Sequence, residues 1–344
     1  MRTMLIALAA ALAIAGGAHA AGTKQVKDWL GVCANTGACS AFGFAPEEDE
    51  NGGYLIIQRD AGPVAAPKVT IVFDPGDKQP TADWRLSLDG QPIASVGPVH
   101  AAGSEAGARA QLSGRAASAL IAALRNGQSL EVSAGGKSQV EISLAGSAAI
   151  LLWLDEQQGR LDTVTALARP GAKPAASVPA AAAALLILAA PPIEQKGVPD
   201  HAPKGMTKGV DDCDLDPTVT PDDIVARLAA GVVLWGPQCG MGAYNEVSVF
   251  FLGDEHARNL KRISFPEPPG AGQAKDDILI NASFDPKTQT MAMFSKARGI
   301  GDCGQVTDWV WNGKTFALIS DDVMPACRGV PGEDWPPLFV SRQK

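Results

Sequence analysis

The chain has 344 residues, of which 46% are hydrophobic and 19% charged, and its 29 basic and 37 acidic residues give a formal net charge of −8. This composition excludes a disordered chain, and the 37 glycines and 25 prolines indicate a loop-rich protein rather than a helical bundle. The acidic balance removes the electrostatic attraction that a nucleic-acid partner requires. The length fits two domains of ordinary size.

The N-terminal residues have the pattern of a secretory signal peptide. Arg2 supplies a basic start, an apolar run spans residues 5–15, and small residues lead to Ala20. This pattern predicts cleavage between Ala20 and Ala21 and export to the periplasm. The apolar run is too short to cross a bilayer, so no transmembrane segment is expected in the mature chain. The alternative is an ordinary N-terminal helix.

The cysteine pattern predicts disulfide bonds. An even number of cysteines in an exported chain indicates disulfides, because the periplasm oxidises thiols. Local pairing is the simplest arrangement, since the cysteines form three neighbouring couples. These are Cys33 with Cys39, Cys213 with Cys239, and Cys303 with Cys327. A zinc site is the alternative, but the sequence has no C-x-x-C pair and only four histidines, so we expect no metal and no cofactor.

The first domain is expected to span residues 21–168 and to resemble a β-sandwich. Short apolar runs separated by glycine, proline and aspartate are typical of strands. They cover residues 54–59, 68–73, 83–88, 130–133 and 140–144. Two segments have helical periodicity instead, at residues 116–125 and 148–158, and each is followed by a glycine stop.

Residues 169–199 form a proline- and alanine-rich linker between the domains. Six prolines bracket an apolar run of 11 residues, 180–190, where a membrane-spanning helix needs about 20. A second membrane anchor is the alternative. The sequence favours a linker whose apolar stretch packs against one of the domains.

The second domain, residues 200–344, is expected to be an antiparallel β domain. Strand-like runs cover residues 232–235, 246–252, 260–265, 278–284 and 290–294. With the first domain, this pattern predicts a mostly β (α+β) fold class: two β-rich domains that carry a few short helices and are stapled by disulfides.

A hairpin is predicted around Asn312-Gly313, which is the strongest short-range turn pattern. With these two residues as the loop, Trp309 pairs with Phe316. Because side chains alternate along a strand, Trp309, Trp311, Phe316 and Leu318 are expected to share one face.

Several motifs resemble those of a known bacterial family. They are Arg298-Gly-Ile-Gly-Asp-Cys-Gly, Trp309-Val-Trp-Asn-Gly-Lys-Thr-Phe-Ala-Leu, Met324-Pro-Ala-Cys-Arg-Gly, Leu154-Asp-Glu-Gln-Gln-Gly-Arg with Thr165-Ala-Leu, and Gly240-Met-Gly-Ala-Tyr-Asn. Together they resemble the family called domain of unknown function 1176. The resemblance covers nearly the whole mature chain, and it implies export and six disulfide-bonded cysteines without implying an activity.

The first half is also similar to the invasion-associated locus B family of exported β-sandwiches. The similarity rests on Asp28-Trp29 before Cys33, on the spacing of Leu120, Leu124 and Leu130, and on residues 140–146. A second cysteine pair of that family is missing here.

One candidate binding site lies around the third cysteine couple. Residues 299–304 have the G-x-G-x-x-G pattern of a dinucleotide-binding site. Such a site needs a helix directly after the motif, whereas a strand-like run follows here, so the sequence favours a glycine-rich turn. The predicted disulfide would bring Arg298 and Arg328 together as a site for a small anion or carboxylate, and Asp302 is a further candidate binding residue beside it. Trp309 and Trp311 are candidates for an aromatic platform that binds a glycan, although core packing is the favoured interpretation.

The sequence offers no clear catalytic residue. Asp212, Asp214, Asp216 and Asp223 imitate part of a calcium loop, but Pro217 replaces the required glycine, which favours a solvated acidic turn. Asp155 and Glu156 are candidates for a pair of carboxylates in acid–base catalysis. They are adjacent in a predicted helix, so their side chains splay apart, which disfavours that role. Glu156 is four residues before Arg160, the spacing of an ordinary surface ion pair. Neither a G-x-S-x-G nor an H-E-x-x-H motif occurs.

We therefore expect an exported, non-catalytic protein of the periplasm that binds an envelope protein, a glycan or a small anion. One alternative is an enzyme that hydrolyses cell-wall glycan or peptide with carboxylates that the sequence does not identify. The other is a structural or stress-protective protein of the envelope.

Overall fold

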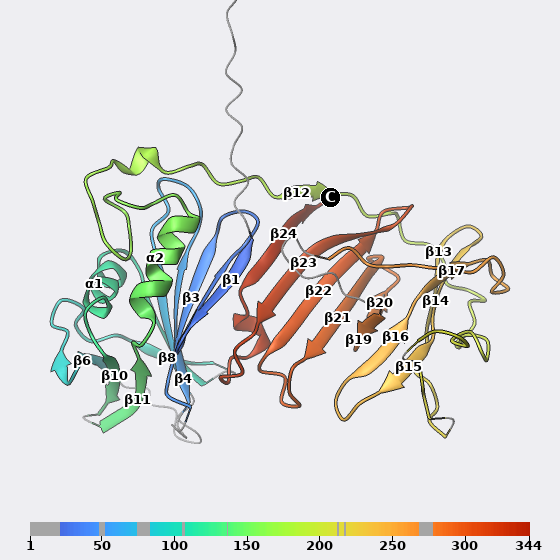
Figure 1. Cartoon of the computed structure of the whole chain (residues 1–344), viewed down its shortest axis with the longest axis horizontal. Helices are drawn as coiled ribbons and strands as arrows, with labels where there is room; N and C mark the ends of the chain where they lie inside the picture. The colour runs from blue at the N-terminus through green and yellow to red at the C-terminus, as the bar shows by residue number, and fades with distance from the viewer. Residues whose placement is uncertain are drawn as a thin grey trace, which may run out of the picture.

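The computed structural model describes residues 21–47, 52–73, 83–104, 107–135, 137–211, 213–216, 218–267 and 278–344. The expected signal peptide, with Ala20, lies outside the described residues. The described chain is mostly β, with five sheets and two α-helices. We call residues 21–168 the first half and residues 200–344 the second half; the two β-rich halves lie side by side (Figure 1). The expected fold class is confirmed. None of the described helices is both long and apolar enough to cross a membrane.

A seven-stranded antiparallel sheet, here called sheet I, organises the first half. Its strands in spatial order are β1 (Gly22–Val26), β2 (Trp29–Cys33), β3 (Cys39–Phe44), β4 (Gly53–Arg59), β5 (Lys68–Phe73), β9 (Gly107–Leu112) and β8 (Ala101–Ser104). Its central strands are almost continuously buried, as in β2 and β3. Continuous apolar runs are typical of strands that are covered on both faces, and both faces of sheet I are covered.

The inner face of sheet I packs against a second sheet and both helices. Sheet II has the order β11 (Lys137–Ser143), β10 (Ser129–Ala134), β6 (Trp84–Leu88) and β7 (Gln91–Pro92). Helices α1 (Gly114–Leu124) and α2 (Ser147–Gln157) confirm the two predicted helices. Helix α2 lies close to β2 because Gly31 leaves room for the Trp153 ring: a Cβ at Gly31 would lie 2.7 Å from that ring.

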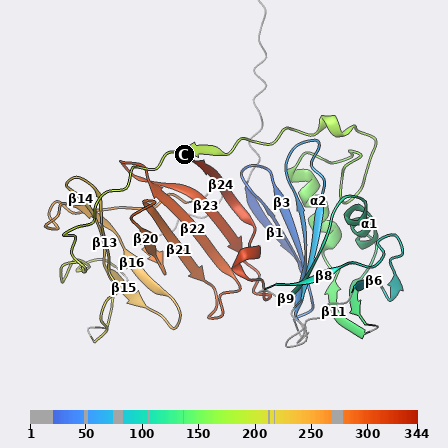
Figure 2. The ribbon, with the colours of Figure 1, turned by 180° about the vertical axis from the view of Figure 1, so that it is seen from behind.

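The segment between the halves, residues 169–199, runs along one edge of the molecule (Figures 1 and 2). It holds a 3-10 turn, η1 (Ala175–Ser177), and a short strand, β12 (Leu185–Ile187), which pairs in parallel with β24 (Pro337–Gln343). This pairing attaches the backbone of the apolar run to the second half. Its leucine side chains stay in solvent, with Leu185 59% and Leu188 56% exposed.

The second half is built on sheet III. Its strands in order are β12, β24, β23 (Phe316–Met324), β22 (Gly304–Trp311), β21 (Thr290–Lys296) and β20 (Ser283–Asp285). Strands β22 and β23 form the predicted hairpin, but the predicted register is wrong. Trp311 pairs with Phe316 and Trp309 with Leu318, so the loop is residues 312–315. The predicted common face is confirmed, since these four side chains lie in one core.

The Asn312 side chain explains the longer loop. Its carboxamide oxygen accepts hydrogen bonds from the backbone N–H groups of Lys314 and Thr315, both at 3.0 Å. A two-residue type I′ turn needs positive φ at both loop positions. In this turn Gly313 has it, at φ +94°, whereas Asn312 does not.

Two small sheets complete the second half. Sheet IV has the order β13 (Ile224–Ala229), β14 (Val232–Gly236), β17 (Phe251–Gly253) and β18 (Lys261–Arg262), and sheet V the order β15 (Gln238–Met241), β16 (Glu246–Val249) and β19 (Ile278–Ile280). The single strands predicted over 246–252 and 278–284 are each split in two. The second break falls at Asn281, which has φ +45° and whose side chain binds the backbone N–H of Glu246 and the carbonyl of Phe294.

The outer face of sheet I packs against the second half in a contact that we call the seam. An apolar cluster crosses it and combines Phe42 and Ile56 of sheet I with Met324 and Trp335. At one end, the Asn35 carboxamide accepts a hydrogen bond from the Val340 N–H at 2.8 Å. The two halves thus share a core as well as polar contacts.

Asp334 of η2 (Gly332–Asp334) makes a polar contact across the seam. Its Oδ2 accepts a hydrogen bond from the Tyr54 hydroxyl and another from the Arg109 guanidinium, both at 2.5 Å. Burial and the neighbouring carboxylate raise the pKa of Tyr54, so the phenol remains a donor.

Three disulfides join Cys33 to Cys39, Cys213 to Cys239, and Cys303 to Cys327. The local pairing predicted from the sequence is therefore confirmed. Each bond lies within one half, so the seam depends on noncovalent contacts and on the linker.

Because the seam joins the two halves, we expect them to stay associated after the linker is cut. With a site for a specific protease inserted after the exposed Lys196, cleavage should leave two pieces that elute together in size-exclusion chromatography. They should separate only in denaturant, because the apolar seam holds them. Separate elution of the pieces in native buffer would contradict a stable seam.

Candidate functional site

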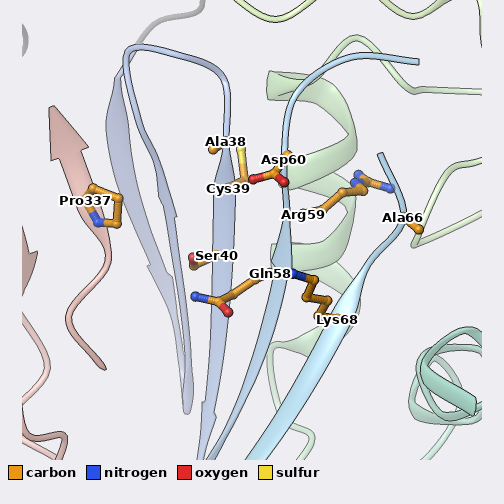
Figure 3. A pocket seen from close by; sticks show the side chains of 9 residues that line it. All are labelled: Ala38, Cys39, Ser40, Gln58, Arg59, Asp60, Ala66, Lys68 and Pro337. Atoms are coloured by element: carbon orange, nitrogen blue, oxygen red, sulfur yellow. The ribbon is translucent and has the colours of Figure 1, made fainter. Parts of the chain in front are cut away.

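A small pocket opens at one end of the seam, and we call it the seam pocket. It has a volume of about 180 Å³ and lies over strands β3, β4 and β5 of sheet I, with Pro337 of β24 on the opposite side (Figure 3). Its lining residues are Ala38, Cys39, Ser40, Gln58, Arg59, Asp60, Ala66, Lys68 and Pro337.

Strand register brings three polar side chains of this pocket into one row. Ser40 pairs directly with Gln58, and Gln58 pairs directly with Lys68, so all three side chains point to the same face of sheet I (Figure 3). Among the described residues, none of these three side chains has a hydrogen-bond or ion-pair partner. The row therefore presents a hydroxyl, an amide and an ammonium group to whatever enters the pocket.

Behind the pocket lies a buried ion pair. The Arg59 guanidinium donates to Asp155 Oδ1 of α2 at 2.8 Å, and both side chains are almost fully buried. Gln158 accepts from Arg59 Nε at 2.6 Å. Burial lowers the pKa of Arg59 to about 10, against the opposing effect of the Asp155 contact, so the guanidinium stays charged at neutral pH.

Asp155 and Gln158 also tie three loops together. The Asp155 carboxylate accepts the backbone N–H groups of Leu167 and Ala168. The Gln158 amide donates to the carbonyls of Gly37 and Asp60. The side chains of the 154–160 motif therefore fix the walls of the seam pocket, a role that its spacing did not reveal.

The position of Arg160 differs from the one predicted from the sequence. Its predicted surface ion pair with Glu156 does not form, because Arg160 is fully buried. Its guanidinium donates instead to the Thr165 hydroxyl at 2.8 Å and to the Gly62 carbonyl. The chain turns inward here because α2 ends at Gln157, and this contact anchors the loop between β4 and β5.

The seam pocket suits a small anionic or hydroxyl-rich ligand. Lys68 supplies a positive charge, and Gln58 and Ser40 supply hydrogen bonds of adaptable direction. The Asp60 carboxylate also lines the pocket, and the Cys39 sulfur is part of a disulfide. The hydroxyl, amide and ammonium groups of the row can together bind a small polar ligand.

The structure places the predicted anion-binding residues around the Cys303–Cys327 disulfide, and each cation there has a carboxylate partner. Arg298 binds both oxygens of Asp302, one of them at 2.6 Å. Burial opposes ionisation of Asp302, but the hydrogen bonds from Arg298 and from the Gly329 N–H outweigh it and lower the pKa. An external anion would have to compete with Asp302.

Arg328 is held across the seam. Its guanidinium lies 2.6 Å from Asp28 of the first half, 3.5 Å from Glu47, and over the Phe44 ring at 5.7 Å. Its side chain is only 11% exposed. In this structure the charge of Arg328 joins the two halves.

The two candidate platform residues are buried. Trp309 is 1% and Trp311 2% exposed, within the aromatic core of the second half. The Trp309 indole donates to the Pro266 carbonyl at 2.7 Å, and its ring lies 5.1 Å from the Phe265 ring. Neither indole faces solvent as a glycan platform would.

The glycine-rich and acidic motifs have structural roles where they are described. Strand β22 begins at Gly304, the last glycine of the G-x-G-x-x-G motif. Gly304 has φ +140°, and a Cβ there would lie 2.0 Å from the Ser295 carbonyl oxygen, so this position requires glycine. In the calcium-like stretch, Asp216 binds Thr218, and Asp223 accepts the N–H groups of Ala202 and Gln238. Asp212 and Pro217 lie outside the described residues.

A second group of carboxylates, which the sequence did not single out, lies on the β22–β23 hairpin. Asp308 pairs with Ser320, and Asp322 lies one pair further on the same face, so the two are diagonal neighbours. Burial, followed by the charges of Asp321 and Asp308, raises the pKa of Asp322 to about 6. Burial also raises the pKa of Asp321, which is 0% exposed.

The raised pKa predicts that Asp322→Asn stabilises the protein at neutral pH. The carboxyl has a pKa of about 6 when folded and 3.8 as an ordinary group, so the folded state binds this proton more tightly than the unfolded chain. Stability is therefore lost as the pH rises from about 4 through about 6. The amide carries no charge, and we expect a gain of about 1–2 kcal/mol at pH 7.5, after discounting for partial exposure, and none at pH 4.

Thermal unfolding at the two pH values measures this effect, with Glu141→Gln on an exposed position as the matched control. An equal change of melting temperature at both pH values would contradict the assigned cause.

A family model and one curated relative each match nearly the whole chain. A family model described as "Protein of unknown function (DUF1176)" matches residues 23–342. The chain is 28% identical over 334 residues to "Uncharacterized protein YpfG" of Escherichia coli strain K12, and the alignment covers 93% of each chain. No solved structure shows a significant match. Because the family model spans nearly all of the sequence, this chain belongs to the DUF1176 family of proteins of unknown function.

Proposed function

We propose that this chain is exported to the periplasm and acts there as a non-catalytic binding protein of the cell envelope. Its ligand carries a small anionic group, either free or as part of a glycan, and the seam pocket holds that group. The observation that carries the proposal is the row of Ser40, Gln58 and Lys68, which faces a pocket with uncommitted polar groups.

Three arginines that are buried or line the seam support this choice by their pairing with carboxylates. Arg59 binds Asp155, Arg109 binds Asp334, and Arg328 binds Asp28. Lys68 is exposed at the pocket and has no carboxylate partner among the described residues. The Asp60 carboxylate lines the same pocket but forms no ion pair with Lys68, so a ligand anion displaces no internal partner. A charge-assisted hydrogen bond at Lys68 is stronger than a neutral one.

Calorimetric titration of the mature protein tests the proposal. The probes are inorganic phosphate, N-acetylmuramic acid and N-acetylglucosamine, of which the last lacks the carboxylate of the second. We expect the two anions to bind and Lys68→Gln to weaken them about tenfold or more. Lys24→Gln, on strand β1 of the same sheet, is the matched control and should bind like the wild type.

The probes also separate the sources of the anionic group. Tighter binding of N-acetylmuramic acid than of phosphate indicates an acidic glycan, and the reverse order indicates a free anion. Equal affinities for the wild type and Lys68→Gln, or no saturable binding of either anion, would overturn the proposal.

The proposed export has its own test. Intact mass of the protein isolated from periplasm should correspond to cleavage between Ala20 and Ala21, with six hydrogens fewer than in the reduced chain. A mass that retains the first twenty residues would refute export through this leader. Six thiols that react with an alkylating agent in the native protein would refute the disulfides in the cell.

A second candidate function, hydrolysis of envelope glycan, is favoured by the diagonal pair of Asp308 and Asp322. A carboxyl group with a pKa of about 6 is suited to donate a proton near neutral pH. If the pair is catalytic, the mature protein releases reducing ends from purified peptidoglycan and Asp322→Asn loses that activity. No release by the wild type would refute this candidate.

A further inference from the structure

A second pocket lies on the other side of the loop between β4 and β5. It has a volume of about 390 Å³ and is bounded by residues 63–67, by helix α1 and by residues 164–170. Ala66 touches both this pocket and the seam pocket. The volume falls within the range of ordinary small-molecule sites, about 300–1,000 Å³.

Aliphatic side chains form its floor and rim. Ile121 of α1 and Leu167 are buried at the floor, at 1% and 4% exposure. Val64 and Val164 stand at the rim and are 95% and 56% exposed. An aliphatic ligand would cover the two exposed valines, and removal of that apolar area from water favours binding.

One charged group faces this apolar lining. Arg125 follows the last residue of α1, and its Nε donates to the Leu167 carbonyl at 2.6 Å, which fixes the guanidinium at the pocket wall. The two terminal nitrogens of Arg125 have no hydrogen-bond or ion-pair partner among the described residues. The Ser118 and Thr165 hydroxyls are occupied by the Gly114 carbonyl and Arg160.

We propose that this pocket binds an aliphatic carboxylate, with the acyl chain between Val64, Val164 and Ile121 and the carboxylate on Arg125. The lining matches both parts of such a molecule: an apolar chain has aliphatic walls, and its single negative charge has a single uncommitted guanidinium. This site differs from the seam pocket in its cation and in its apolar character, and it does not depend on the function proposed there.

Calorimetric titration with decanoate and decan-1-ol tests the inference, because the two probes share a chain and differ in charge. The mature wild-type protein should bind decanoate about tenfold more tightly than decan-1-ol. Shortening the acid from ten to eight carbons should weaken binding about fourfold for each methylene. Arg125→Gln should remove the preference for the acid, and Val64→Asp should weaken both probes.

Two control variants locate the site. Arg115→Gln changes an exposed arginine on the same helix and should bind like the wild type, as should Lys68→Gln in the seam pocket. Equal affinities for acid and alcohol in the wild type, or a loss of decanoate binding in Lys68→Gln with none in Arg125→Gln, would overturn the proposal. So would the absence of saturable binding of either probe.

Discussion

Asp155→Asn should destabilise the protein by about 3–5 kcal/mol. The substitution leaves the Arg59 guanidinium charged and buried without its carboxylate, and an uncompensated buried charge is among the most costly defects in a protein core. The amide also keeps only one acceptor oxygen, so its NH2 group faces the backbone N–H of either Leu167 or Ala168, which donated to the carboxylate. Urea unfolding followed by tryptophan fluorescence measures the loss.

The next residue provides a matched control. Glu156 is exposed on the same helix turn, and Glu156→Gln should change the free energy of unfolding by less than about 0.5 kcal/mol. The double variant Arg59→Met with Asp155→Leu should be more stable than Asp155→Asn, because it removes both charges. If Asp155→Asn unfolds like Glu156→Gln, the ion pair does not support the loops around the seam pocket.

Trp309→Ala should cost about 3–5 kcal/mol through lost burial and the cavity left behind. The indole is 1% exposed, contacts the Phe265 ring and donates to the Pro266 carbonyl. Lys314→Ala in the exposed loop of the same hairpin is the control and should have little effect. Melting curves of the two variants check the prediction, and a Trp309 variant that melts like the wild type would contradict the core assignment.

Local chemistry explains why much of the fold could be predicted from the sequence. Both helices follow from apolar spacing and glycine stops, and the disulfides join cysteines that are close in sequence. Apolar strands such as β4 and β5 were found for the same reason. Strand β1, with the polar sequence GTKQV, has no apolar pattern and was not predicted.

Nonlocal contacts explain what could not be predicted. The split of the strand at Asn281 depends on side-chain bonds to Glu246 and Phe294, which are distant in sequence. Arg160 has the spacing of a surface ion pair, and only the turn after α2 shows that its charge lies inside. The same limit applies to the seam, whose apolar cluster joins strands from opposite ends of the chain.

The seam pocket illustrates how partial the sequence information is. Gln58 and Lys68 stand at the facing ends of two apolar runs, so a hairpin register could have paired them. Ser40 comes from a strand that was not predicted, and Arg59 becomes a wall of the pocket through a partner almost a hundred residues away. The polar residues at the ends of apolar strands were the available sequence evidence for this site.

Chemical-shift mapping tests the central claim most directly. Inorganic phosphate is titrated into nitrogen-15-labelled mature protein, and the backbone amide shifts are followed residue by residue. We predict that the largest changes cluster at residues 38–40 and 58–60 and at Ala66 and Lys68, which line the seam pocket. Largest changes at Arg298 and Arg328 instead, or no saturable change in the protein, would contradict the claim that the seam pocket is the anion-binding site.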